Sequence, residues 1–369
     1  MILSTKNFYN QKQHLDSFED IFNIIYNNKT KNNEDNLFVT FMDDQIDDNM
    51  RSYVNGKISK NINLLRNLLY SMKNCSDLSY HEYKIPKKKG GFRDIAEPNI
   101  ELKSIQATAY RMLLFSCLIC PNDKAFAYIP NRGTIDMANE HKSNKYILKM
   151  DLKDFFPSIT AELLKTVLLR NYAFYQINLY FPDFIDELIK IACYKGSLPQ
   201  GSPLSPYLSN LVMLEFDYMI RQKADFCKYT RYADDMVFSS SNYISPKLYT
   251  AKVEETLKTL FRDKIKLNKE KTKMVKTTGR CYVVGVKINN NNEISFGHEK
   301  KKKLKYQLYN MFKAYEQDKN SVPKEQIQET LGLFSYMKQI EPAYAKYLER
   351  KLLEQFHSTK ATLSKHFKY

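Results

Sequence analysis

The chain has 369 residues, with 57 Lys and Arg against 41 Asp and Glu, and therefore a formal net charge of +16. This length suggests two or three folding units, and the 43% of hydrophobic and 13% of aromatic residues argue against a disordered chain. The sequence lacks the run of about 20 apolar residues that spans a membrane and the apolar core of an N-terminal signal peptide, so we expect a cytoplasmic protein with polyanionic partners.

The N-terminal third is predicted to be mainly helical, with one basic hairpin. Residues 1–50 are polar, and we expect them to form an N-terminal helical extension. Apolar residues at helical spacing predict a helix over 58–72. The segment 83–96 predicts two short strands that flank the basic, Gly-containing turn 87–91. A long apolar-rich segment, 100–120, is predicted to be helical.

The middle of the chain alternates strands with helices, which indicates an α/β or α+β unit followed by a separate helical unit. Helices are predicted over four segments: 161–170, 184–194, 207–221 and 246–261. Strands are predicted over four others: 145–151, 265–267, 273–276 and 282–288. Residues 226–239 indicate two strands joined by a tight turn at Ala233-Asp234-Asp235. The tail, 299–369, is basic and is predicted to be helical.

Three carboxylates stand in contexts that predict a metal site. Asp151 ends an apolar strand, and Asp234 and Asp235 lie at the turn of the hairpin with apolar residues on both sides. Adjacent carboxylates in an apolar hairpin repel each other and are costly to desolvate, and a divalent cation relieves both problems. Mg²⁺ takes a few carboxylates and leaves positions for phosphate oxygens and water. Two such ions about 4 Å apart can activate a 3′-hydroxyl and stabilise a leaving pyrophosphate.

Five motifs, taken in order, resemble those of the reverse transcriptases. The hairpin signature is Tyr232-Ala233-Asp234-Asp235, and the first aspartate motif is Asp151-Leu152-Lys153-Asp154-Phe155-Phe156-Pro157-Ser158-Ile159. The other three are the fingers segment that begins with Arg93-Asp94-Ile95, the loop 198–206 and the segment 267–273. Their order and spacing agree from about Lys84 to Ile288, which is more than half of the chain.

The resemblance implies an α+β, right-hand polymerase fold. Fingers would occupy residues 51–140 with part of 160–200, and a palm of antiparallel sheet with packed helices would occupy 141–288. A helical, basic thumb would occupy 289–369. The activity that the resemblance implies is RNA-directed DNA polymerisation from deoxynucleoside triphosphates.

The resemblance also implies roles for residues around the reacting groups. Asp151, Asp234 and Asp235, together with the backbone carbonyl of Leu152, would hold two Mg²⁺ ions. Phe156 stands at the position of a steric gate, where a bulky ring would clash with a 2′-hydroxyl and favour deoxynucleotides. The alternative for Phe156 is ordinary core packing.

Further residues would bind the nucleotide. Arg93 would grip the triphosphate, because a planar, permanently charged fork suits phosphate oxygens. Gln200 and Gly201 would line the nucleotide and template pocket, where glycine lets the backbone approach a ligand closely; a plain loop is the alternative. Lys271 matches a lysine proposed to give a proton to pyrophosphate.

Two groups of lysines are expected to contact nucleic acid. The fingers turn carries Lys87, Lys88 and Lys89. The start of the thumb carries Lys300, Lys301, Lys302, Lys303 and Lys305, interleaved with aromatic residues that can stack on unpaired bases. A solvated hairpin tip and a solvated helix face are the alternatives.

Two segments resemble the retron branch of the family. Met137-Ala138-Asn139-Glu140-His141 is similar to an Asn-Ala-x-x-His segment, with Met in place of Asn, and Val283-Val284-Gly285 to a Val-Thr-Gly segment, with Val in place of Thr. The resemblance implies a structured noncoding RNA that serves as template and primer, with synthesis from a guanosine 2′-hydroxyl giving a branched RNA–DNA. It further implies antiphage defence in bacteria with a separate effector protein. His141 would recognise nucleic acid, or alternatively be a packed or capping histidine.

Two other functions stay open. The chain could be another standalone defence or abortive-infection reverse transcriptase that makes untemplated or protein-primed DNA. It could instead be an RNA-binding scaffold with an inactive polymerase site, although such a scaffold has no reason to keep three costly carboxylates together. A group II intron protein is disfavoured because no maturase or endonuclease segment follows the thumb. A hydrolase is disfavoured because the six His show no zinc spacing and no Ser/His/Asp motif.

Overall fold

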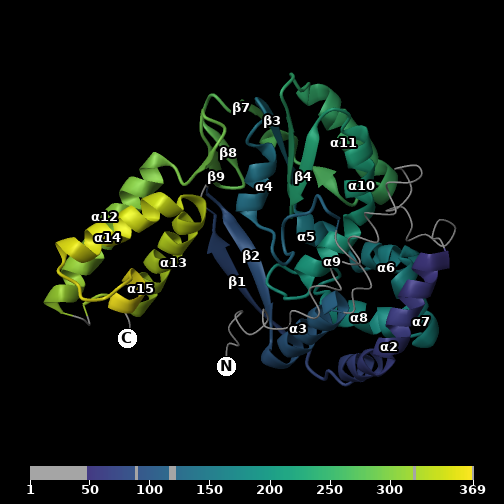
Figure 1. Ribbon diagram of the computed structural model, residues 1–369. Coiled ribbons are helices and arrows are strands. Elements are labelled where there is room, and N and C mark those ends of the chain that lie inside the picture. The colour runs from purple at the N-terminus through teal and green to yellow at the C-terminus, as the bar shows by residue number, and fades with distance from the viewer. Residues whose placement is uncertain (1–47, 88–89, 116–121, 319–320, 368–369) are drawn as a thin grey trace. The chain divides into compact units, whose positions relative to one another are not determined.

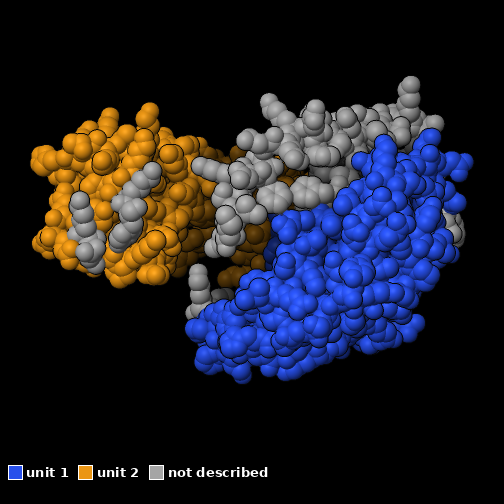
Figure 2. Space-filling model, turned by 90° about the horizontal axis from the view of Figure 1, so that it is seen from below, with its two compact units in different colours: residues 1–128, 151–225, 247–270 blue, residues 129–150, 226–246, 271–369 orange. Residues whose placement is uncertain are grey.

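A computed structural model describes residues 48–87, 90–115, 122–318 and 321–367 (Figure 1). Most of the expected N-terminal extension, residues 1–47, lies outside the described residues, as do Lys88 and Lys89. The chain divides into two compact units, coloured in Figure 2. Unit 1 comprises residues 1–128, 151–225 and 247–270, and unit 2 comprises 129–150, 226–246 and 271–369. Within the described part, no helix is long and apolar enough to cross a membrane. The boundaries expected for fingers, palm and thumb stay a prediction.

Unit 1 combines a helical bundle with a two-stranded ribbon. Its helices are α2 (Asp48–Lys73), α3 (Ile100–Phe115), α5 (Phe155–Ser158), α6 (Ala161–Arg170), α7 (Tyr172–Tyr180), α8 (Phe184–Ala192), α9 (Ser205–Val212), α10 (Leu214–Lys223) and almost all of α11 (Pro246–Phe261). The ribbon pairs β1 (Tyr80–Pro86) with β2 (Phe92–Pro98) in antiparallel register. The helix expected over 58–72 is confirmed within α2, because Ile58, Leu65 and Met72 are buried on one face. That face packs on α3, α7 and α8.

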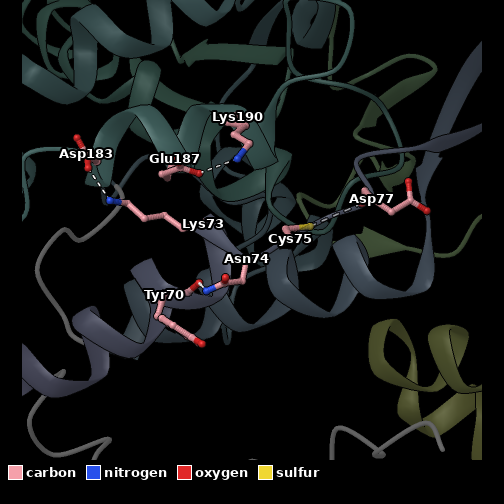
Figure 3. A network of polar contacts seen from close by, with 8 residues as sticks. All are labelled: Tyr70, Lys73, Asn74, Cys75, Asp77, Asp183, Glu187 and Lys190. Atoms are coloured by element: carbon pink, nitrogen blue, oxygen red, sulfur yellow. Dashed lines mark hydrogen bonds and ion pairs between the residues drawn. The ribbon is translucent and has the colours of Figure 1, made fainter.

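Polar contacts tie the end of α2 to the start of α8 (Figure 3). Lys73 Nζ donates to Asp183 Oδ2 at 2.5 Å, and Asp183 immediately precedes α8. Just after α2, Cys75 Sγ donates to the carbonyl of Asp77 at 3.6 Å. The first contact links the end of α2 to the start of α8, and the second is local to the turn that follows α2.

The central sheet has the strand order β4-β5-β3-β6, and β7 also pairs with β3. Its strands are β3 (Tyr146–Lys153), β4 (Lys228–Tyr232), β5 (Asp235–Ser240), β6 (Lys266–Leu267) and β7 (Lys273–Lys276). The pairings β4–β5, β3–β6 and β3–β7 are antiparallel. Strand β3 begins in unit 2 and ends in unit 1. Its apolar side chains are buried, as the predicted strand over 145–151 requires.

Unit 2 also contains a small sheet and the C-terminal helices. The small sheet has the order β10-β9-β8 and packs on α4 (Thr134–His141). Its strands are β8 (Cys281–Val283), β9 (Val286–Ile288) and β10 (Ile294–Ser295). The tail forms α12 (His298–Gln317), α13 (Lys324–Ile340), α14 (Pro342–Gln355) and α15 (Leu363–His366). α13 packs on both α12 and α14, and the three lie side by side in Figure 1. Helices and antiparallel sheets together confirm the expected α+β class.

Several segments differ from the prediction, including α4 and β10, where no helix or strand was expected. The helix expected over 207–221 is two helices, α9 and α10, because the chain breaks at Met213, whose N–H bonds back to Ser209 and Leu211. The single strand expected over 282–288 is a hairpin of β8 and β9. Its turn residues Val284 and Gly285 both have positive φ, at 42° and 83°. Helix α7 was not expected, since its aromatic and apolar residues give no amphipathic period.

Candidate functional site

The β4–β5 hairpin presents Asp234 and Asp235. Tyr232 pairs with Asp235, so Ala233 and Asp234 form a two-residue turn. Ala233 is in the left-handed region, with φ of 54°, which costs a residue with a Cβ about 1–2 kcal/mol. Asp234 is half-buried and Asp235 exposed, whereas residues 236–240 are all buried. The hairpin predicted from the sequence is thus confirmed, with the carboxylates at its solvent-facing end.

A buried arginine supports this turn. Arg231 is 0% exposed, although it lies on the strand that leads directly to the exposed turn. Its Nη1 donates to the carbonyl of Ala233 at 3.0 Å. A buried guanidinium needs hydrogen-bond acceptors. The Ala233 carbonyl is one of them, and it accepts this bond only while the turn keeps its shape. The sequence motif gave no sign of this role.

Asp151 lies at the end of β3 in unit 1, where it is 8% exposed. Asn268 donates to it twice, from its backbone N–H to the Asp151 carbonyl at 2.8 Å and from Nδ2 to Oδ1 at 3.4 Å. Leu152, the next residue, is 1% exposed and pairs with Leu267 of β6. The segment 267–273, the last of the five motifs in the chain, therefore contacts the first aspartate motif through Leu267 and Asn268.

The three carboxylates are divided between the units, Asp151 in unit 1 and Asp234 and Asp235 in unit 2. In the part of the chain that the structure describes, no three His, Cys, Asp or Glu side chains are grouped so as to hold a metal ion. The chemistry of the donors fits a hard divalent cation, because all are carboxylate oxygens and two of the three residues reach solvent. The metal site stays a prediction.

The two rings that follow Asp154 are used differently. The chain turns at Asp154, with φ of 45°, into the single turn of α5. Phe155 is 2% exposed and fills the core, while Phe156 is half-buried and meets the exposed ring of Tyr128 edge-on at 6.4 Å. Core packing is therefore the role of Phe155, and the role of the half-buried Phe156 as a steric gate stays a prediction.

The basic hairpin expected in the fingers segment is confirmed as the β1–β2 ribbon. The N–H of Lys87 donates to the carbonyl of Gly91 at 2.9 Å and closes the turn. The side chain of Lys87 is exposed, and so is that of Arg93, which pairs with Ile85 across the ribbon. Arg93 forms no ion pair with the described residues. Its guanidinium is thus available to a phosphate group.

The loop 195–206 packs against β2 through Gly201. The N–H of Ala96 donates to the Gln200 carbonyl at 2.8 Å. Gly201 has φ of 121°, and a Cβ there would lie 2.6 Å from the carbonyl oxygen of Ala96. We expected a glycine here because a ligand approaches the backbone closely. In the structure, the group that approaches closely is the Ala96 carbonyl of the ribbon. The side-chain oxygen of Gln200 is buried and has no hydrogen-bond partner among the described residues.

Gln106 holds this loop from within, a role that the sequence motif did not reveal. It is 0% exposed, and its Nε2 donates to the carbonyl of Ile191 at 2.6 Å and to the Tyr80 hydroxyl at 2.9 Å. Its Oε1 accepts a hydrogen bond from Ser202 Oγ at 2.8 Å. One amide therefore joins α3 to β1, to α8 and to the loop that carries Gln200.

The prediction that His141 contacts nucleic acid is wrong. The side chain is 0% exposed, with Nδ1 2.6 Å from Ser239 Oγ and Nε2 2.6 Å from Thr230 Oγ1. Both ring nitrogens are therefore occupied inside unit 2. Burial, with a smaller effect of Lys228, lowers the pKa of His141 to about 3, so the ring stays neutral at neutral pH. The packed histidine, our alternative, is what the structure contains.

The lysines at the start of α12 fall into two classes. Lys301 pairs with Glu341 at 2.8 Å and lies over the ring of Tyr344, and Lys300 Nζ donates to the carbonyl of Gly285 at 2.9 Å. The ammonium group of Lys301 is thus paired within unit 2, contrary to the expectation that it contacts nucleic acid. The other four are exposed: Lys300, Lys302, Lys303 and Lys305. Lys271 is also exposed, at the end of the 3₁₀ turn η4 (Lys269–Lys271).

An open cavity of about 570 Å³ lies in unit 1 beside α11, β6 and η4. Asn268, the partner of Asp151, is part of its lining. Basic residues prevail over acidic ones in that lining: Lys153, Lys258, Arg262, Lys266 and Lys269 against Glu254, Asp263 and Glu270. The lining of this cavity therefore carries a net positive charge.

Comparison with known proteins gives one family. Residues 85–306 match the reverse transcriptase (RNA-dependent DNA polymerase) family. The chain is 35% identical over 286 residues to the retron Ec83 reverse transcriptase of Escherichia coli, covering 74% of this chain and 86% of that protein. It is 32% identical over 286 residues to the retron Ec73 reverse transcriptase of the same species, covering 74% and 87%. A solved telomerase from Candida albicans, in complex with a fragment of telomeric RNA, aligns with a TM-score of 0.43 at 13% identity, covering 78% of this chain and 56% of the telomerase.

The contact of Gly201 with β2 makes a first prediction. We expect Gly201→Ala to lower the melting temperature and to weaken DNA synthesis, because its Cβ would overlap the Ala96 carbonyl. Gly196→Ala is the matched control, since Gly196 also has positive φ, at 79°, but nothing within 4 Å of a Cβ. In denaturant unfolding, we expect Gly201→Ala to lower the free energy of unfolding by about 2 kcal/mol more than Gly196→Ala does. Equal costs for the two variants would contradict the contact.

The neutral state of His141 makes a second prediction. Its pKa is about 3 in the folded protein and 6.5 ordinarily, so the unfolded chain binds a proton first as the pH falls. The stability that the neutral ring contributes is therefore present above pH 6.5 and lost below it, by at most about 1.4 kcal/mol per pH unit. We expect the difference in unfolding free energy between the wild type and His141→Asn to shrink from pH 7 to about pH 5. Parallel curves for the two proteins would refute this.

Proposed function

The chain belongs to the reverse transcriptase family and to its retron branch, and we propose that this RNA-directed DNA polymerase copies part of a partner noncoding RNA into single-stranded DNA. The membership confirms the predicted right-hand polymerase fold. The observation that carries the proposal is the identity to retron enzymes over most of their length. The segments 137–141 and 283–285, which resemble retron motifs, support the same branch.

For the reaction centre, we propose that Asp151, Asp234, Asp235 and the carbonyl of Leu152 hold two Mg²⁺ ions. Enzymes of this family use divalent metal ions and deoxynucleoside triphosphates. When bound, such ions supply the positive charge that activates the priming hydroxyl and stabilises the leaving pyrophosphate. The solvent-facing turn of β4–β5 supports this assignment, because phosphate oxygens can reach Asp234 and Asp235 there. Asn268 supports this assignment too, because its Nδ2 donates to Asp151 Oδ1 and leaves Oδ2 without a bond from this residue.

For the nucleotide, we propose that the exposed Arg93 binds the triphosphate and that the face of Phe156 excludes a 2′-hydroxyl. Gln200 and Gly201 line the template and nucleotide pocket. The side-chain oxygen of Gln200, which has no hydrogen-bond partner among the described residues, is an acceptor for a base. Lys271 gives a proton to the leaving pyrophosphate. Exposure supports these roles for Arg93 and Lys271.

For the nucleic acid, we propose contacts from the exposed lysines, in which the phosphates gain charge-assisted hydrogen bonds. These are Lys87 on the ribbon and Lys300, Lys302, Lys303 and Lys305 on α12. Lys88 and Lys89, which follow Lys87 in the sequence and lie outside the described residues, are proposed to contact nucleic acid as well. The partner RNA serves as template and primer. Synthesis begins at a guanosine 2′-hydroxyl and gives a branched RNA–DNA, in the bacterial cytoplasm and in antiphage defence with a separate effector protein.

A prediction about the carboxylates tests the site. We expect the double variant Asp234→Ala/Asp235→Ala to lose Mg²⁺-dependent DNA synthesis by at least about a thousandfold, because the metal charge at the reacting phosphate is lost. RNA binding should be unchanged in a filter or gel-shift assay. The control is Asp186→Ala, an exposed aspartate on α8 outside the hairpin, with wild-type synthesis. Full activity of the double variant would overturn the site assignment.

A second experiment tests the branch of the family. The chain is purified after expression with its native flanking DNA, and the nucleic acid that accompanies it is sequenced and treated with a 2′–5′ debranching enzyme. We expect one structured RNA, joined to single-stranded DNA and released by debranching. Linked DNA without a branch would favour a standalone defence enzyme with another primer. Unrelated cellular RNA without any linked DNA would contradict the retron proposal.

A further inference from the structure

His141 joins the two strands of the hairpin that carries Asp234 and Asp235. It is the last residue of α4, and its ring bonds Ser239 on β5 through Nδ1 and Thr230 on β4 through Nε2, each at 2.6 Å. No part of the side chain reaches solvent. The bridge is therefore made by a buried group that contacts neither of the candidate metal ligands.

The bridge fits one register of the hairpin. Thr230 lies opposite Val237, and Ser239 is two residues beyond Val237 on the same strand. Both hydroxyls therefore stand on the same face of the hairpin as diagonal neighbours, within reach of one imidazole. A shift of one residue would turn Ser239 to the other face and break the bridge. The same register sets Asp235 opposite Tyr232.

The Ser239 hydroxyl is itself oriented by a third residue. Asn144 Nδ2 donates to Ser239 Oγ at 2.7 Å, and the N–H of Asn144 donates to the carbonyl of His141 at 3.1 Å, so the turn after α4 closes on the same hydroxyl. A neutral imidazole has one donor and one acceptor nitrogen, and a hydroxyl can serve as either, so both bonds are satisfied together. Lys228 Nζ, which donates to the carbonyl of Glu140 at 3.2 Å, adds a second link from β4 to α4.

We propose that His141 is a positioning residue for DNA synthesis, which fixes the β4–β5 hairpin against α4 and thereby the direction in which Asp234 and Asp235 present their carboxylates. The inference rests on the proposed function of those two carboxylates. Because misplacement of a reacting group by about 1 Å can cost about a hundredfold in rate, a loose hairpin lowers the rate of nucleotide addition rather than the affinity for RNA or nucleotide.

Variants that remove one bond at a time provide the test. His141→Asn places an amide near the position of Nδ1 and loses the bond to Thr230; His141→Gln places it near Nε2 and loses the bond to Ser239. Thr230→Val and Ser239→Ala remove the hydroxyls with little change of volume, so they keep the test available if a histidine variant does not fold. His81→Asn, at an exposed histidine on β1, is the matched control.

We expect Thr230→Val and His141→Asn each to lower kcat about tenfold, with KM for deoxynucleotide and the Kd for RNA within about twofold of wild type. The double variant should be no slower than the slower single one, because both changes remove the same bond. The control should keep wild-type kcat.

Two results would overturn the proposal. One is an unchanged kcat in folded variants whose only defect is a lower melting temperature. The other is an additive loss in His141→Asn/Thr230→Val, which would mean that the two residues act separately. Failure of the proposed function is distinguishable, because it appears as DNA synthesis by the Asp234→Ala/Asp235→Ala variant.

Discussion

The β4–β5 hairpin must expose two adjacent carboxylates at its turn while the rest of its second strand is buried, and much of unit 2 follows from that constraint. An ionised carboxylate is expensive to remove from water, so the turn has to reach solvent directly from the core. The chain achieves this with a left-handed Ala233, whose carbonyl accepts a hydrogen bond from the buried Arg231. Helix α4 covers the base of the hairpin and ends in His141, which bonds both strands.

Unit 1 holds its own candidate site residues, Asp151 and Arg93, by hydrogen bonds and close packing. Asp151 is nearly buried, and Asn268 bonds both its backbone carbonyl and its carboxylate. The ribbon with Arg93 is exposed along most of its length, yet its base is held to the loop 195–206 through the close approach at Gly201. Gln106 supports that loop from the interior. The exposed ribbon is thus joined at its base to a loop that is hydrogen-bonded to the interior of unit 1.

Local sequence was sufficient where one element carries its own signal. The periodicity of 161–170 and 246–261 predicted α6 and α11 at both ends, and α6 begins at Thr160, whose side chain caps it. The failures have physical causes. α7 is apolar on too many sides to show a period, Met213 interrupts what reads as one helix, and Val284-Gly285 turns what reads as one strand. In each, packing against other elements outweighs the local pattern.

The sequence by itself determined the family, the hairpin with its two aspartates, the basic ribbon and the order of the motifs, because these depend on residues adjacent in the chain. Only the tertiary structure decided which polar side chains are turned inward. Three residues that we expected near a ligand each have a partner within the chain. His141 bonds Ser239 and Thr230, Lys301 pairs with Glu341, and Gly201 lies against the carbonyl of Ala96. Those partners lie 40 to 105 residues away, and burial and hydrogen bonding over such separations are set by the packing of the folded chain.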